Sequence, residues 1–132
     1  MDILHLIKRL IDAEPKHFSW SVSTTSNWVD NTISKRDIFV IGFSDTIKVF
    51  NISKNDLNAN IDNLNESELT YAVIRVASES DMRILFWEEK FLDTVTYCVR
   101  IWQPNKASQS IKEIKENNLF KAVCLAYLSN YE

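Results

Sequence analysis

The chain has 132 residues, a formal net charge of -3, 45% hydrophobic and 11% aromatic residues, and a single glycine, Gly42. Its length is typical of one domain and its apolar content is enough for a core, so we expect a single domain over residues 1–132. Phosphate-binding loops, dinucleotide fingerprints and nucleophile elbows all depend on glycine. The composition therefore argues against those classes of enzyme and favours a binding protein.

An amphipathic helix is predicted at the N-terminus. Apolar residues recur there at helical spacing, and Pro15 ends the pattern because the residue before a proline avoids helical geometry. The apolar positions are Ile3, Leu6, Ile7, Leu10 and Ile11.

Three strands are predicted next. Apolar and hydroxyl residues alternate over residues 18–28, which is typical of a strand with one apolar face. Residues 37–43 and 46–52 are rich in β-branched and aromatic residues and indicate two more strands. Gly42 lies inside the first of these two, which predicts a bulge or a close packing contact there.

The middle of the chain is predicted to hold a short helix and then a strand meander. Ser53 followed by Asp56 is typical of a helix start, and apolar spacing extends this helix over residues 54–65. Strands are predicted over 69–77, 82–88 and 93–102, because these segments are β-branched or aromatic and their connections are short.

A long final helix is predicted after Pro104, which ends the sheet. Ser110 and Glu113 form a capping-box pattern, and apolar residues at helical spacing continue to Leu128. The predicted fold is α+β in the order α-β-β-β-α-β-β-β-α. It has five or six mainly antiparallel strands, with the N-terminal and C-terminal helices packed on the sheet.

The nucleophilic and metal-binding side chains are few. Cys98 and Cys124 lie in apolar segments, so we expect buried, unpaired thiols in a cytoplasmic protein. His5 and His17 have no metal-ligand spacing, and nothing pairs either with a cysteine. We therefore expect no metal, no cofactor and no catalytic residue. Charges interrupt the N-terminal segment, and no apolar run is long enough for a membrane span.

Acidic residues are concentrated in residues 55–81, which hold six carboxylates against the single Arg75. Such a segment repels nucleic-acid phosphate and attracts a basic protein. A solvated surface is the ordinary explanation of a charge run. The residues that we predict to contact a partner are Asp62, Glu66, Glu68, Glu79 and Asp81.

Trp28 is a sixth candidate for partner binding. Its neighbours are polar, as they would be around an exposed tryptophan that anchors an interface. The alternation that starts at Phe18 equally places Trp28 on the core face of the strand. Both alternatives stay open from the sequence.

These features favour a non-catalytic inhibitor of the immunity or antitoxin type. It would cover a basic partner, such as a nuclease toxin, with its acidic surface. One alternative is a secretion or assembly chaperone, which would expose apolar grooves to an unfolded client. Another is a small enzyme that uses Glu66, Glu68 or Asp81. An enzyme would gather two or more of these acids around one pocket, whereas an inhibitor would display them on its surface.

Overall fold

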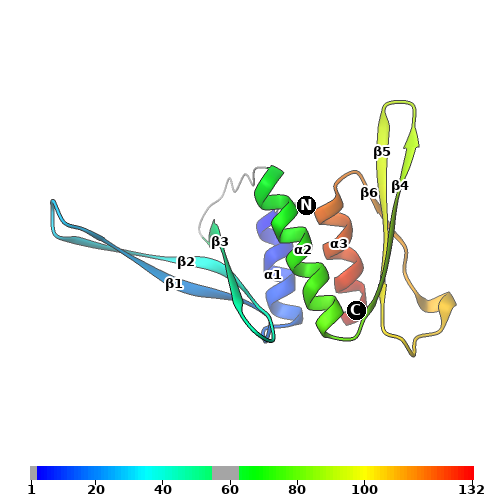
Figure 1. The fold of residues 1–132 in the computed structure, drawn as a ribbon, viewed down its shortest axis with the longest axis horizontal. Coiled ribbons are helices and arrows are strands. Elements are labelled where there is room, and N and C mark those ends of the chain that lie inside the picture. Colours follow the sequence, from blue (N-terminus) through cyan, green and yellow to red (C-terminus); the bar gives the residue numbers. More distant parts are fainter. Residues whose placement is uncertain (1–2, 55–62) are drawn as a thin grey trace. The chain divides into compact units, whose positions relative to one another are not determined.

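The computed structural model describes residues 3–54 and 63–132. The chain divides into two compact units, Met1–Asn60 and Ile61–Glu132, called here the N-terminal and C-terminal units. Figure 1 shows their helices and strands. None of the described helices is long and apolar enough to cross a membrane.

The N-terminal unit combines one helix with a three-stranded antiparallel sheet in the order β1-β2-β3. The elements are α1 (Ile3–Ala13), β1 (Phe18–Asn27), β2 (Thr32–Gly42) and β3 (Ile47–Ser53). Phe39 lies at the centre of an aromatic cluster, with its ring centroid 6.3 Å from that of Phe18, 5.9 Å from Trp20 and 6.0 Å from Phe50. The predicted helix before Pro15 and the three predicted strands are confirmed.

The outer halves of β1 and β2 form a two-stranded ribbon, residues 22–37, which we call the β1–β2 ribbon. The two strands pair along their whole length, from Phe18–Ile41 to Asn27–Thr32, whereas β3 pairs with β2 only over Ile38–Gly42. Figure 1 shows the ribbon as a long, narrow hairpin. A two-stranded ribbon is only marginally stable in water, so this segment depends on the sheet at its base.

The C-terminal unit places two helices against a second antiparallel sheet, of order β4-β5-β6. Helix α3 contacts β5 and β6, α2 contacts β4, and the two helices contact each other, so both lie on the same face of this sheet (Figure 1). The elements are α2 (Asn63–Glu79), β4 (Arg83–Phe91), β5 (Thr94–Trp102), β6 (Ile114–Glu116) and α3 (Leu119–Leu128). Between β5 and β6 lies a 3-10 turn, η1 (Ser108–Ser110), and a second, η2 (Ser129–Tyr131), follows α3.

The predicted α+β class and the order of the elements are confirmed, and the six strands of the described residues form two three-stranded antiparallel sheets. The predicted strand over 69–77 is wrong, because this segment belongs to α2. Its buried positions have helical spacing, and this periodicity outweighs the β propensity of its valines and isoleucine. These buried residues are Leu69, Ala72, Val73, Val76 and Ala77. The helix predicted over 54–65 falls mostly outside the described residues.

The predicted start of the last helix is also wrong. Ser110 ends η1, and its hydroxyl donates to the carbonyl of Ala107 instead of capping a helix. Glu113 pairs with Arg100 of β5 at 2.9 Å, and residues 114–116 form β6. The helix begins at Leu119, after the true cap, Asn118. The capping-box pattern therefore did not start a helix here, because the segment after it pairs with β5 as a strand.

Both cysteines lie in the core of the C-terminal unit, as predicted. Cys98 and Cys124 are fully buried, and neither forms a disulfide. Burial raises the pKa of the Cys98 thiol, and the nearby carboxylate of Glu89 raises this pKa further. These thiols are therefore structural rather than reactive.

Candidate functional site

A groove of about 470 Å³ opens on the C-terminal unit between α2, the β4–β5 strands and the start of α3. Its lining mixes apolar and aromatic side chains with amides and hydroxyls, and one carboxylate. The lining residues are Glu66, Ser67, Thr70, Tyr71, Ile74, Phe86, Tyr97, Asn117, Asn118 and Leu119. The volume lies in the range that small molecules or a few partner side chains fill.

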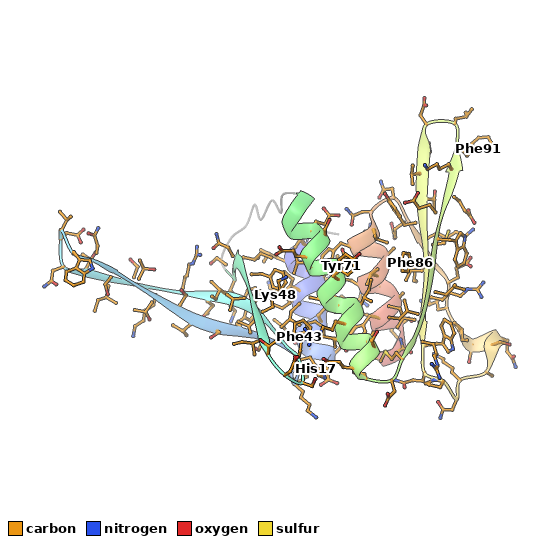
Figure 2. All side chains as sticks on the ribbon, viewed as in Figure 1. His17, Phe43, Lys48, Tyr71, Phe86 and Phe91 are labelled. Atoms are coloured by element: carbon orange, nitrogen blue, oxygen red, sulfur yellow. The ribbon has the colours of Figure 1, made fainter. Side chains whose placement is uncertain are left out.

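Two aromatic side chains at this groove are exposed. Tyr71 of α2 has 75% of its surface exposed and Phe86 of β4 has 53% (Figure 2). Tyr71 is left outside because the buried side of α2 is already defined by Leu69, Val73 and Val76. Exposed rings beside a hollow are typical of protein interaction surfaces.

The polar end of the groove is held by a hydrogen bond between its two helices. Asn118 Nδ2 donates to Glu66 Oε1, while Asn118 Oδ1 accepts from the backbone N–H of Lys121 at 2.9 Å. The hydroxyl of Thr70 donates to the backbone carbonyl of Glu66 at 2.8 Å. The carboxylate of Glu66 is therefore fixed in position at the groove rather than free to rotate.

The other acidic candidates do not share this site. Glu68 lies two residues after Glu66, which is about 200° further around the helix. Glu79 pairs with Arg75 at 3.3 Å near the far end of α2, roughly 20 Å from Glu66 at the helical rise per residue. Asp81 follows in the turn before β4, with φ 61°, beside a second hollow that it lines with Arg83. Asp62 lies outside the described residues.

Trp28 is exposed. It lies in the turn that closes the β1–β2 ribbon, and 96% of its surface is accessible. Its neighbour Val29 is 97% exposed. Of the two alternatives left open by the sequence, the structure supports an exposed tryptophan at the tip of the hairpin.

The described residues contain no group of three or more His, Cys, Asp or Glu side chains that could hold a metal ion. His17 is tied to its own sheet, because its Nδ1 lies 2.9 Å from the carbonyl oxygen of Gly42. Glu66 alone among the described acidic candidates lines the groove. The arrangement thus offers one fixed carboxylate beside apolar surface, which is suited to recognition.

The aromatic part of this site was not predicted from the sequence. Tyr71 and Ile74 fell in a segment predicted to be a strand, and Phe86 was predicted only as part of the strand over 82–88. The buried spacing of Leu69, Val73 and Val76 was the signal for the helix, and it would have placed Tyr71 outside the core. The contact between Asn118 and Glu66 joins residues 52 positions apart and has no sequence signal.

Comparison with known proteins adds no functional assignment. No family model, curated protein or solved structure matches the chain. The geometry of the groove is therefore the basis for a functional proposal.

Proposed function

We propose that this protein is a non-catalytic inhibitor of the immunity or antitoxin type, which binds a basic protein partner through the groove of its C-terminal unit. The observation that carries the proposal is the exposed pair Tyr71 and Phe86 beside the fixed carboxylate of Glu66. Of the acidic residues predicted to contact a partner, this proposal retains Glu66 alone. The aromatic side chains supply most of the binding energy.

The aromatic pair supports a protein partner over a solvated surface. Exposed Tyr and Phe side chains cost free energy in water, and their burial by a partner recovers it at about 25 cal/mol per Å² of apolar area. Aromatic residues are also enriched among the few interface residues that dominate affinity. A partner segment with one or two apolar side chains would fill the groove.

The carboxylate supports a basic partner. Glu66 lies at the edge of the groove, and its acceptor Oε1 is already engaged by an amide rather than by a cation. A lysine or arginine of the partner could pair with the second oxygen while its stem lies on the aromatic rings. Such a pair directs association and selects against acidic partners.

A chaperone is the second candidate, because an open groove flanked by exposed aromatic side chains also suits an unfolded client. The two functions differ in what they bind. An inhibitor binds one folded partner and abolishes its activity, whereas a chaperone binds many extended apolar segments with similar affinity.

The test is capture with matched variants. Immobilised wild-type protein and a Tyr71→Ser/Phe86→Ser double variant are exposed to the same lysate at low salt, and the retained proteins are identified. We expect one basic protein to be retained by the wild type and lost from the double variant. The purified partner should lose its activity when the wild type is added and keep it with the double variant.

A second pair of exposed apolar residues provides the control. Phe91 and Leu92, at the tip of the β4–β5 hairpin, are 78% and 89% exposed and do not line the groove. Their replacement by serine should leave capture unchanged. Equal retention by the Tyr71→Ser/Phe86→Ser variant would contradict the proposal, and retention of many unrelated unfolded proteins would favour the chaperone.

A further inference from the structure

The outer edge of β1 is an unprotected sheet edge. Within the described residues β1 pairs with β2 alone, along its whole length. The strand carries no charged residue and no proline, and its sequence is FSWSVSTTSN. Natural proteins normally protect such edges with charges, prolines or bulges, because the exposed N–H and C=O groups pair with other strands.

The other described sheet edges of this protein are protected by charge. The edge strand β4 carries Arg83, Glu88, Glu89 and Lys90. The edge strand β3 carries Lys48, and β6 carries Lys115 and Glu116. Of these edge strands, β1 is thus the one that carries no charged residue, over a length of ten residues.

The β1–β2 ribbon also exposes apolar side chains on the face that continues from the aromatic cluster. Val22 of β1 is 62% exposed, and Ile33 of β2, opposite Ser26, is 67% exposed. Trp28 and Val29 at the tip are almost fully exposed. A ribbon of two strands becomes stable when further strands are added to it, so both its backbone edge and its side chains favour a neighbour.

We propose that β1 pairs antiparallel with β1 of a second copy of this chain, which joins the two N-terminal sheets into one continuous six-stranded sheet. A second copy fits this edge because an uncharged strand meets itself without like-charge repulsion across the ladder. The pairing is isologous, so it closes as a dimer and leaves no further β1 edge exposed. This inference is independent of the groove proposed above.

The pleat restricts the register of this pairing. Residues that pair across an antiparallel ladder lie on the same face of the sheet. A residue of one copy therefore pairs with the same-numbered residue of the other copy, or with one whose number differs from its own by an even number. Two registers give the longest ladder on Phe18–Asn27, with residue 22 or residue 23 opposite itself. We propose the second, with Ser23 opposite Ser23 and a ladder from Ser19 to Asn27, because it brings Trp28 to the other copy's aromatic cluster. Trp28 of each copy then lies level with Phe18 of the other, at the edge of the aromatic cluster.

Cross-linking tests this register directly. Opposed residues have Cα atoms about 4.5–5.5 Å apart, within the range of a disulfide. Under mild oxidation of the native protein we expect Ser23→Cys to form a covalent dimer efficiently. Ser21→Cys should not, since the Cα atoms at position 21 of the two copies would be about 13 Å apart along the strands. The natural cysteines are buried and should not contribute.

Sedimentation provides the second test. The wild type should form a dimer, and Val22→Lys should weaken dimerisation at least tenfold, because the lysines of the two copies become diagonal neighbours across the new ladder. The variant should still fold, since position 22 is exposed and faces Asp37 within the ribbon. Ile33→Lys, on the same face but on β2, is the matched control and should dimerise like the wild type.

Three results would overturn the proposal. They are a wild-type protein that is monomeric at every concentration, a Val22→Lys variant that dimerises as well as Ile33→Lys, and equal cross-linking of Ser23→Cys and Ser21→Cys. A monomeric wild type would instead favour a different protein as the strand donor.

Discussion

Asn118 donates a hydrogen bond to the carboxylate of Glu66 while its side-chain oxygen caps α3. Through this one amide the first turn of α2 is joined to the first turn of α3, and the polar end of the groove takes its shape. A substitution that removes this hydrogen bond therefore affects both helices.

We therefore predict that Asn118→Ala destabilises the protein. The loss of the cap costs about 1 kcal/mol, and the loss of a hydrogen bond to a charged group adds about 1.5 kcal/mol or more. The free energy of unfolding, measured by urea denaturation, should fall by roughly 2–3 kcal/mol in total. An effect below about 0.5 kcal/mol, the usual size for surface substitutions, would mean that the contact contributes nothing.

Asn118→Asp separates the two roles of this side chain. The carboxylate keeps the cap acceptor but faces Glu66 with a like charge. We expect this variant to be less stable than the wild type at pH 7, and the difference to narrow as added salt screens the repulsion between the two carboxylates. A difference that does not change with salt would show that repulsion at Glu66 is not the cause.

The aromatic cluster should dominate the stability of the N-terminal unit. Phe39 is fully buried and contacts the rings of Phe18, Trp20 and Phe50. Phe39→Ala should cost about 3–5 kcal/mol in the free energy of unfolding, because it leaves a cavity that the neighbouring rings cannot fill. The fluorescence of the tryptophans reports the transition, and Val49→Ala, at a position 53% exposed, serves as the control.

Five of the six strands and the first helix were predictable because their signals are local. The alternation that starts at Phe18, the apolar run over 37–43 and the helical spacing before Pro15 each specify one element without reference to distant residues. The segment 69–77 failed because its β-branched residues and its helical spacing disagree, and packing against α3 decided between them. The groove depends on Asn118 meeting Glu66 across 52 positions, which no local pattern specifies.

Gly42 shows that a glycine in a strand does not by itself specify a bulge or a close contact. A bulge or a close contact was expected there, yet the register irregularity lies between Ile38 and Phe39. A Cβ at position 42 would meet its nearest atom, the backbone oxygen of His17, at 3.9 Å, and φ is not positive. Neither a close contact nor a positive φ therefore requires a glycine at this position.

Gly42→Ala should therefore be neutral or stabilising by about 0.4–1 kcal/mol, because alanine restricts the unfolded chain more than glycine does. Asp81→Ala is the contrasting variant. There φ is 61°, and alanine in the left-handed region should cost roughly 1 kcal/mol. Thermal melting of both variants would test this, and an unstable Gly42→Ala variant would point to a constraint that the backbone geometry does not reveal.

The buried thiol of Cys98 predicts a loss of stability at alkaline pH. Its pKa is raised by burial and by Glu89, so the thiol stays neutral in the folded state when it ionises in the unfolded chain. Stability from this group is complete below the unfolded pKa of about 8.5 and declines as the pH rises above it. Cys98→Ala should lower stability at pH 7 but flatten its decline between pH 8 and pH 10. An unchanged slope would show that another group causes the decline.

The charge of Glu66 should act on association rather than on folding. Glu66→Gln keeps an oxygen to accept the hydrogen bond of Asn118 but removes the negative charge at the groove. With the basic partner in hand, we expect this variant to associate more slowly than the wild type at low ionic strength. The difference should shrink as salt screens the interaction, with a Debye length of about 8 Å near 0.15 M.

Glu68→Gln is the matched control, because it makes the same change of charge on the side of α2 that does not line the groove. If both variants slow association equally, the effect comes from net charge, and the assignment of Glu66 to the contact surface is wrong.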